Sequence, residues 1–375
     1  MNIRRVSTFD APGLEDAWAR LSAVSPRASL FSTYEWCRCW AETVGRRAEV
    51  AILLFEDAGG QVIGLLPACI ERTGPARWLK FLGRERVSGD HLDLLCASDD
   101  HAACLDALVS YLDECGEHHG IVLGELEHDS LTLARLVEWA DRQLYSFHQR
   151  EPRVVPYVHL PATFEDYLAS LSTNMRYHVR RRRRDLAREP AAGVELLRDA
   201  DVVLGALDDL YALHEQRWRR DGYPGVFQQP AKREFMQRFC AVACARGWVR
   251  CYVLIADGVR CGVLLAFHWR GTASYYQMGW APDGPLASPG VLLLAESIEQ
   301  AIREGLDTYD FLRGDEEYKR KWTSDAVAQR TLVVGQRIPA RAAIAAEHVK
   351  DRIKWVFHET LGTARWEQLK RVLKG

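Results

Sequence analysis

Residues 306–322 constrain this chain more than any other stretch, because the pattern of side chains changes in the middle. The first half alternates aromatic or apolar residues with aspartates, which is typical of a β-strand. The alternation stops at Gly314, where a turn meets no Cβ clash, and beyond it Asp315, Tyr318 and Lys319 are spaced to share one helix face. The stretch predicts a strand whose carboxyl end delivers polar groups into a turn, where α/β sheets usually place their chemistry. The alternative is an exposed turn followed by a salt-bridged surface helix.

A second informative feature is the start of a helix just upstream of this strand. Residues 275–280 predict a strand, and residues 281–287 predict a loop with two prolines and a glycine. Ser288 and Pro289 then suit the N-cap and the first position of a helix. Gly290 would let a ligand approach the backbone, and a helix N-terminus can hold a phosphate group. Ordinary helix capping without a ligand is the alternative.

The region before this helix predicts a three-stranded antiparallel meander. Strand patterns and hairpin turns follow one another at residues 249–256, 257–258, 259–269, 270–271 and 272–279. Two helices are predicted before the meander and one strand after it, at residues 201–220, 232–246 and 331–334. This order predicts a mixed α/β (α+β) fold with a mostly antiparallel central sheet flanked by helices.

A helix predicted at residues 172–188 carries seven arginines, five of them consecutive. Because successive helix residues point in different directions, five consecutive arginines surround the helix and cannot all face one ligand. We expect a subset, led by Arg176 and Arg180, to hold an anionic substrate, a CoA phosphate or a nucleic-acid backbone. A solvated basic helix neutralised by nearby acids is the alternative.

The first 160 residues predict another α/β half. Its strand and helix patterns fall at residues 3–7, 13–21, 31–36, 50–55, 62–71, 78–82, 91–96, 101–115, 120–125, 130–142, 145–150 and 154–160. Trp36 and Trp40 are expected to serve mainly as core residues. Asp90, His91 and Asp93 have the residue types of an acid–base or metal cluster. Because no third ligand motif accompanies them, the preferred interpretation is a polar loop at a strand edge.

Length, charge and composition limit the kinds of protein that this chain can be. A chain of 375 residues is long enough for two domains, and a formal net charge of −2 implies no general attraction to nucleic acid or anionic membranes. No apolar run approaches the roughly 18 residues of a membrane-spanning helix, and the N-terminus has no signal-type apolar region. The ten cysteines are scattered and lack zinc spacing, which favours free thiols in a reducing compartment. We therefore expect a cytoplasmic protein with no metal and no transmembrane segment.

Several of these features together resemble a known family. They are the Ser-Pro-Gly helix start at 288–290, the strand ending in Tyr-Asp-Phe at 309–311, and the closing pattern of Gly314-Asp315, Tyr318-Lys319 and Trp322. They resemble the CelD-like branch of the GNAT acyltransferase superfamily, also called the BioF-like acetyltransferase domain. That family is similar in architecture to the Fem-type peptidoglycan transferases, which carry two GNAT-like domains in one chain.

The resemblance is densest between residues 176 and 322 and weaker over residues 31–67. One departure from the superfamily is that the Gln/Arg-x-x-Gly-x-Gly/Ala phosphate loop is absent. Residues 288–290 are the candidate replacement, so the resemblance implies that Ser288 and Gly290 hold the CoA pyrophosphate. It also implies that backbone N–H groups near Met278 or Gly279 polarise the acyl carbonyl.

Resemblance and spacing together assign the remaining roles. Asp315 is the leading base candidate and His214 the second, while Tyr318 is placed like the superfamily's tyrosine acid that protonates the departing thiolate. A buried histidine bonded to the backbone is the alternative for His214. The predicted substrate contacts are Arg176, Arg180, Arg217, Trp218, Arg313 and Lys319.

The predicted organisation is a tandem of GNAT-like domains. An N-terminal GNAT-like domain spans residues 1–160, the acyltransferase domain spans 161–337, and a helical extension spans 338–375. The implied activity is transfer of an acyl group such as acetyl from acyl-CoA to an amine on a small, saccharide or cell-envelope molecule. Two alternatives stay open: a Fem-like transferase that uses aminoacyl-tRNA, and a non-catalytic GNAT-scaffold protein that supports polysaccharide synthesis.

Overall fold

The C-terminal half is built around the antiparallel meander β12 (Val249–Ala256), β13 (Val259–Trp269) and β14 (Thr272–Trp280). The computed structural model describes residues 1–220 and 226–349. Both residues of each hairpin turn, Asp257–Gly258 and Arg270–Gly271, have positive φ. This is the φ signature of type I′ turns, whose twist matches that of the flanking strands. The meander and its turns are therefore confirmed as predicted.

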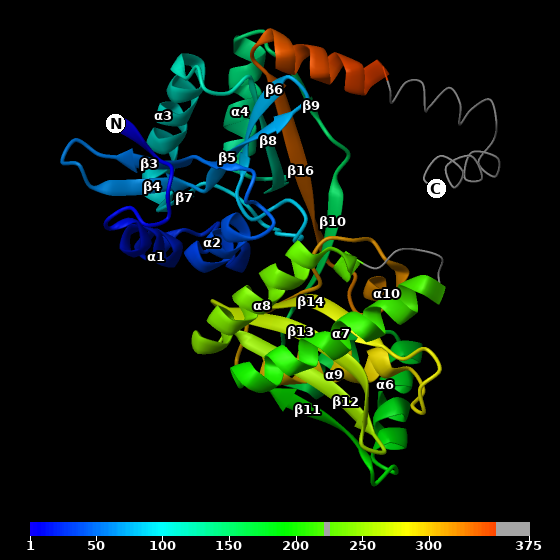
Figure 1. Cartoon of the computed structure of the whole chain (residues 1–375). Coiled ribbons are helices and arrows are strands. Elements are labelled where there is room, and N and C mark those ends of the chain that lie inside the picture. The colour runs from blue at the N-terminus through cyan, green and yellow to red at the C-terminus, as the bar shows by residue number, and fades with distance from the viewer. Residues whose placement is uncertain (221–225, 350–375) are drawn as a thin grey trace.

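Helices cover both faces of this meander (Figure 1). One face carries α7 (Ala200–Arg220) and α8 (Pro230–Ala245), whose apolar side chains merge with the core of the N-terminal half. The opposite face carries α5 (Phe164–Ser170), α6 (Thr173–Leu186) and α9 (Pro289–Arg303), which share a second core. The two faces of the sheet thus pack against different cores. Because successive strand residues point to opposite faces, a residue's position along a strand determines the core in which its side chain packs.

A single twelve-stranded sheet runs through both halves. Its strands follow the order β11-β12-β13-β14-β15-β10-β16-β8-β6-β5-β2, with β9 beside β16. Only the β14–β15 and β6–β8 pairs are parallel among the described strands, so the sheet is mostly antiparallel as expected. The strands not yet introduced are β2 (Glu49–Val50), β5 (Ala68–Thr73), β6 (Ala76–Phe81), β8 (Gly120–Glu127), β9 (Ser146–Gln149), β10 (Arg153–His159), β11 (Ala192–Leu197), β15 (Thr308–Asp310) and β16 (Ala326–Gly335).

The N-terminal half contains a second, four-stranded sheet that the sequence did not predict as separate. It consists of β1 (Asn2–Val6), β3 (Ile52–Glu56), β4 (Val62–Leu66) and β7 (Leu95–Cys96). The predicted strand at 62–71 is in fact two strands, because Pro67 has no N–H to continue the ladder, and β5 joins the large sheet instead. The prediction of a strand over 91–96 is also wrong for residues 91–94, which form a loop.

The remaining helices fill the N-terminal half and the junction. They are α1 (Leu14–Val24), α2 (Tyr34–Glu42), α3 (His101–Glu114), α4 (Leu131–Arg142) and the short α10 (Glu317–Arg320). The core role expected for the aromatic residues of α2 is confirmed, since Trp36 and Trp40 are almost completely buried. The Trp36 ring makes edge contacts with Phe235 and Phe239 of α8, so α2 of the N-terminal half packs against α8 of the C-terminal half.

Strand β16 crosses between the halves. Its first residues pair with β10, and its later residues pair with β8 and β9 of the N-terminal half. The predicted boundaries at 160 and 337 remain a prediction as a division into domains. However, β16 lies in the C-terminal segment of that scheme and pairs with strands of the N-terminal one. Residues 338–349 are helical, and the rest of the predicted extension lies outside the described residues.

Among the described residues, no helix is long and apolar enough to cross a bilayer. The ten cysteines are all free, and eight of them are buried. No group of three or more side chains that could hold a metal ion occurs in the described part of the chain.

Candidate active site between the two halves

Strands β14 and β15 diverge in the middle of the large sheet. They pair at only three positions, and the last pair is Ser274 with Asp310. β14 continues to Trp280, whereas the chain after Asp310 leaves the strand, and Gly314 N–H donates to the carbonyl of Val154 on β10. The ladder that joins the two strands therefore ends at Ser274, and β14 beyond it borders an opening on this side.

The N-terminus of α9 lies beside the outer part of β14. Pro289 occupies the first helical position as predicted, and Ser288 is the N-cap. The Ser288 side chain makes no capping bond, however, because the residue has a left-handed backbone with φ 58°. Its hydroxyl lies 3.3 Å from Nε2 of His178 on α6. The start of α9 is thus a polar corner formed by two helices.

Gly290 packs closely against β14. A Cβ on Gly290 would lie 3.3 Å from the Met278 side chain and 3.5 Å from the Trp280 ring. The Cβ position therefore faces β14, and glycine there allows close helix–strand packing, while its contact with a ligand stays a prediction. Gly279 serves the same purpose on the other face, where a Cβ would lie 2.7 Å from the backbone nitrogen of His214.

Tyr318 is the predicted catalytic residue that lies closest to the strand divergence. Its hydroxyl is 3.3 Å from the hydroxyl of Tyr275, the first residue of β14 beyond the paired segment. Both tyrosines pack with the core that α9 covers. Burial first, and then the charges of Arg182, Arg181 and Lys321, lower the pKa of the His178 imidazole. Two polar pairs, Tyr318 with Tyr275 and His178 with Ser288, therefore lie on the face of the sheet that α9 covers.

The structure does not bring Asp315 into this region. Asp315 precedes α10, whose N-cap is Glu316, and its exposed carboxylate is paired with Arg320. The Arg320 hydrogen bond keeps the pKa of Asp315 below its ordinary value, so the carboxylate is a weak base. The prediction that Asp315 shares a helix face with Tyr318 and Lys319 is wrong, because Asp315 precedes the helix, and its geometry matches the salt-bridged turn that was the alternative.

His214 lies on the opposite face of the sheet from Tyr318. It is buried on α7, where its ring makes an edge contact with Phe227 5.1 Å away. The predicted trio of Asp315, Tyr318 and His214 is therefore not assembled. The side chains of Arg217 and Trp218 lie outside the described residues.

The two cations predicted to bind a substrate anion near Tyr318 have structural partners. Lys319 is 3 % exposed, and its ammonium donates to the carbonyls of Leu312 at 3.1 Å and Arg313 at 3.0 Å. Arg313 forms an ion pair with Glu125, and its backbone N–H donates to Asp90 at 2.9 Å. The contacts of Arg313 hold the turn after β15 against the N-terminal half, and the predicted contact of these two cations with a substrate stays a prediction.

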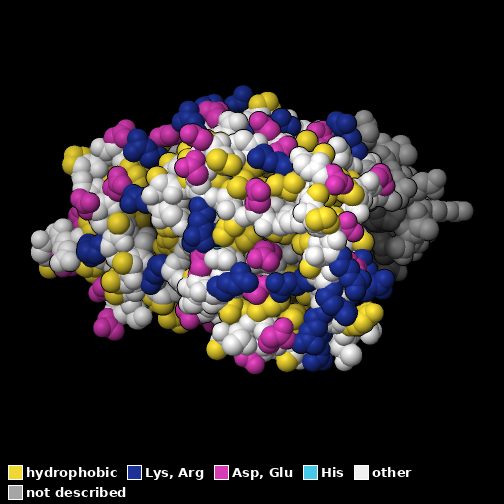
Figure 2. Space-filling model, turned by 90° about the horizontal axis from the view of Figure 1, so that it is seen from below, with side chains coloured by type: hydrophobic (Ala, Val, Ile, Leu, Met, Phe, Trp, Pro, Cys, Tyr) yellow, Lys and Arg dark blue, Asp and Glu magenta, His cyan; other side chains and the backbone are white. Residues whose placement is uncertain are grey.

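The arginines of α6 lie on the surface. Figure 2 shows Lys and Arg side chains gathered toward the end of this face where α6 lies. Arg180 is exposed and bonds to Glu165 at 2.5 Å, and Arg183 bonds to Glu299 of α9 at 2.5 Å. Arg176 is half-buried. Several of these arginines are thus neutralised by acids, and the subset predicted to bind substrate remains a prediction.

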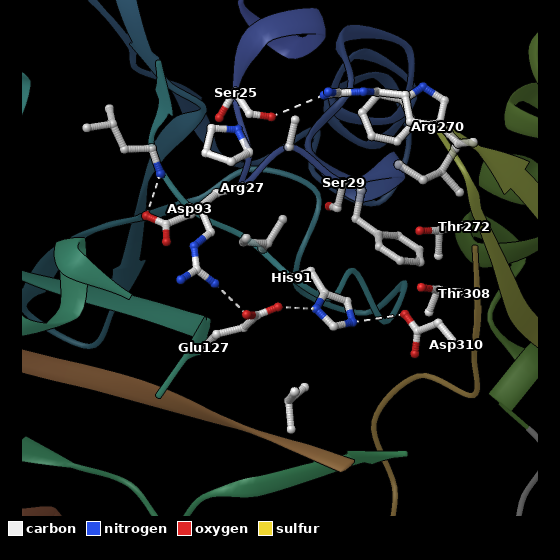
Figure 3. A pocket seen from close by; sticks show the side chains of 18 of the residues that line it. Ser25, Arg27, Ser29, His91, Asp93, Glu127, Arg270, Thr272, Thr308 and Asp310 are labelled. Carbon is white, nitrogen blue, oxygen red and sulfur yellow. Dashed lines mark hydrogen bonds and ion pairs between the residues drawn. The ribbon is translucent and has the colours of Figure 1, made fainter. Parts of the chain in front are cut away.

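On the other face of the β14–β15 pair, a cavity of about 680 Å³ opens between the two halves (Figure 3). Thr272, Ser274, Thr308 and Asp310 line it from the paired strands, because alternate strand residues point to the same side. The opposite wall comes from the N-terminal half, at residues 25–31 and 91–98, and from Glu127 at the end of β8. The volume lies in the range of small-molecule sites.

A chain of alternating charges runs across the wall of this cavity. The His91 ring has Nε2 2.9 Å from Asp310 and Nδ1 2.9 Å from Glu127, and Glu127 in turn pairs with Arg27 at 2.5 Å. Arg27 also reaches Asp129 at 3.1 Å. Figure 3 shows the imidazole between the two carboxylates, which come from different halves of the chain.

The protonation of this chain follows from its geometry. Burial alone would lower the pKa of His91, but Asp310 and Glu127 outweigh burial and raise that pKa well above its ordinary value. The His91 hydrogen bond lowers the pKa of Glu127, and Arg27 adds to this effect. His91 is therefore held between two carboxylates that favour its protonated form.

The sequence pattern around His91 favours a polar loop at a strand edge and does not predict this cluster. Its partners Glu127 and Asp310 lie on strands of different halves, so no short spacing along the sequence indicates the cluster. The usable signal was the alternation in 306–312, which places Asp310 on the face opposite Tyr309. Asp93, the third member of the suspected group, is bonded instead to Ser130 at 2.6 Å.

Comparison with known proteins shows which folds this chain resembles. Residues 173–320 match the family described as Acetyltransferase (GNAT) domain. No curated protein sequence matches the chain significantly. Among solved structures, the chain is similar to FemX at 12 % identity and a TM-score of 0.61, covering 88 % of this chain and 97 % of that one. It is also similar to L-PGS from Bacillus licheniformis at 10 % identity and a TM-score of 0.54, covering 93 % and 99 %. At these identities the similarity shows the fold alone.

Proposed function

The chain has a GNAT-superfamily, Fem-like fold, and from this premise we propose that it is an N-acyltransferase that uses acyl-CoA as donor and a small-molecule amine as acceptor. The observation that carries the proposal is the divergence of β14 and β15 after Ser274, with the N-terminus of α9 next to the outer part of β14. A thioester inserted at the divergence can use backbone N–H groups of β14 as an oxyanion site. The pyrophosphate would then meet the positive end of α9.

The transfer itself needs positioning and proton movement. The amine nitrogen attacks the thioester carbon, a C–N bond forms, the C–S bond breaks, and the leaving thiolate takes up a proton. Tyr318 is the proposed donor of that proton, because its hydroxyl lies beside Tyr275 at the divergence. The amine loses its own proton on the acceptor side. Asp315 is left out of this scheme, since its carboxylate is exposed and paired with Arg320.

The first test is binding of acyl-CoA. A ligand at about 100 times its dissociation constant stabilises the folded chain by about 2.7 kcal/mol, so a panel of acyl-CoAs should raise the melting temperature. Ser288→Asp separates binding from stability. An acid at a helix N-terminus is favourable for the helix and is tolerated in a left-handed conformation, but it repels a pyrophosphate.

We expect Ser288→Asp to fold with an unchanged or higher melting temperature and to lose most of the acyl-CoA shift. Ser172→Asp places the same charge at the N-cap of α6, where Ser172 already caps the helix, and should keep the shift. Equal acyl-CoA affinity in wild type and Ser288→Asp would remove α9 from the proposed donor site.

A second candidate is an aminoacyl-tRNA donor, which the Fem-like fold and the exposed arginines of α6 favour. Basic helices bind nucleic acid with an affinity that falls steeply with salt. RNA that co-purifies and is released by salt, together with no response to any acyl-CoA, would favour this donor. A chain that binds acyl-CoA but never turns it over would instead fit the non-catalytic alternative.

A further inference from the structure

We infer that the cavity between the two halves binds a small hydroxylated compound through its primary ammonium group, which Asp310 and Glu127 hold in place of the proton on His91. This inference rests on the proposed function, since such a compound would be the acceptor. The cavity is lined by residues of both halves. The ion pair of His91 with Asp310 crosses the junction and fixes the positions of its charged groups.

The charges of the cavity favour a cation over an anion. Among the described residues that line it, both guanidinium groups already have partners. Arg27 pairs with Glu127 and Asp129, and Arg270 donates to the backbone carbonyls of Ser22 and Ser25. A ligand carboxylate or phosphate would therefore compete with existing acceptors. Asp310 accepts from the backbone N–H of Leu312 at 2.8 Å and Glu127 pairs with Arg27, and the imidazolium of His91 is the cation that both carboxylates share.

Charge balance indicates what happens when an ammonium group enters. The lining contains the carboxylates of Asp93, Glu127 and Asp310, the guanidiniums of Arg27 and Arg270, and the His91 imidazolium. His101 also lines the cavity, and burial lowers the pKa of its imidazole, so the charges of the lining sum to about zero. A second cation beside the imidazolium would be repelled. If His91 releases its proton to solvent, an ammonium beside the two carboxylates on the cavity side supplies the positive charge instead and the balance is kept. Neutral His91 is then placed to take a proton from the bound amine.

Hydroxyl groups around the charged chain indicate the rest of the ligand. Seven side-chain hydroxyls line the cavity, from Ser25, Ser29, Ser98, Tyr157, Thr272, Ser274 and Thr308. Apolar surface from Phe31, Leu92 and Val155 lies between them. A surface with many hydroxyls and a partly apolar floor suits a polyhydroxylated ring, which offers both polar edges and C–H faces. An amino sugar or a short amino-sugar chain has this chemistry.

The position of the cavity fits an acceptor. Ser274 and Asp310 form the last pair before β14 and β15 diverge, and both line the cavity. The next residues, Tyr275 and Phe311, face the opposite side of the sheet together with Tyr318. An amine held by Asp310 would therefore lie at the same point along the strands as a thioester at the divergence.

Calorimetric titration of the full chain without any donor tests the inference. The probes are D-glucosamine and its β-1,4-linked disaccharide, and the matched neutral probes are D-glucose, N-acetyl-D-glucosamine and its disaccharide. Because hydrogen bonds to charged groups contribute strongly, we expect an aminated probe to bind about 10-fold to 100-fold tighter than its neutral counterpart. Titrations in buffers of different ionisation enthalpy should show about one proton released at neutral pH.

Variants locate the site. Asp310→Asn should abolish the preference for the aminated probe, whereas Asp307→Asn, an exposed acid at the start of the same strand and outside the cavity lining, should keep it. His91→Gln should keep binding and lose the proton release. If Asp310→Asn does not fold, Glu127→Gln replaces it. Equal affinity for aminated and neutral probes, or no binding of either aminated probe, overturns the inference.

The outcome is separable from that of the proposed function. Acyl-CoA binding with no preference for amines would leave the donor site standing and remove the acceptor assignment. Amine binding with proton release, but no response to acyl-CoA, would support the cavity and overturn the proposed donor.

Discussion

Among single residues, His91 combines several constraints that rarely occur together. Its backbone is left-handed with φ 50°, which is uncommon for a residue with a Cβ. Its ring lies between Asp310 and Glu127, and Asp90 adds a third negative charge from the same loop. Arg27 faces Glu127 from the other side. This arrangement joins the two halves through one imidazole between carboxylates, so we expect the chain to lose stability when the proton leaves.

The sign of that effect follows from linkage. The pKa of His91 is raised in the folded chain above the ordinary 6.5, so the folded state binds more protons between 6.5 and the raised value. The stabilisation is fully present below pH 6.5 and is lost as the pH rises through the folded pKa. We expect the free energy of unfolding to fall with pH in this window, by at most about 1.4 kcal/mol per pH unit for one proton.

His91→Gln should make that pH profile flatter, and urea unfolding at several pH values measures it. His159→Gln, which removes an exposed imidazole from β10, controls for the loss of a histidine in general. An identical pH dependence in wild type and His91→Gln would show that the imidazolium between the carboxylates does not contribute.

At the scale of elements, the short helix α10 depends on its surroundings. A helix of four residues is not stable by itself, so tertiary contacts must hold it. Lys319 binds the carbonyls before it, and Trp322 just after it is 2 % exposed in the core beneath α9. The Trp322 carbonyl accepts a hydrogen bond from Tyr167 of α5 at 2.9 Å. These anchors fix the position of Tyr318.

Trp322→Ala should therefore destabilise the chain by about 3–5 kcal/mol, the usual cost of removing a buried tryptophan. Denaturant unfolding measures the change, and Trp322→Phe should lose less because it leaves a smaller cavity. A loss below about 1 kcal/mol for the alanine variant would mean that the ring does not anchor α10.

Elements with local signals were predictable from the sequence, and elements defined by distant contacts were not. The meander was predictable because its alternation and its Asp257–Gly258 and Arg270–Gly271 turns are local properties. The pairing of β16 with β8 and β9 was not, because nothing in a strand's own sequence specifies a partner about 200 residues away.

The same distinction explains the candidate site. Tyr318 and the α9 start were found because they follow a strand and a loop along the chain. The cavity was missed because its wall is assembled from segments near residues 27, 91, 127, 274 and 310, which meet only in the folded molecule. Lys319 and Arg313 were assigned to substrate because a sequence shows their charge but not the carbonyls and the acid that bind them.

At the scale of the whole molecule, the two halves form one structure through three kinds of contact. The large sheet passes through β10 and β16, the rings of α2 and α8 meet at Trp36, and the buried pair of Arg313 and Glu125 crosses the junction. The cavity lies within this junction (Figure 3), and the divergence of β14 and β15 lies next to it. In the proposed arrangement, the donor and the acceptor approach the same strand pair from opposite faces of the sheet.

The most direct test of that account is the release of free CoA thiol from acetyl-CoA when D-glucosamine is added, with the amide product confirmed by mass. Wild type should release thiol and form the amide. Folded Tyr318→Phe should lose about 100-fold or more in kcat with little change in KM, because a positioned acid acts in the transition state. Tyr177→Phe, which alters a tyrosine that is 58 % exposed on α6, should turn over like wild type. Full kcat in folded Tyr318→Phe, or no amine-dependent thiol release by wild type, would contradict the account.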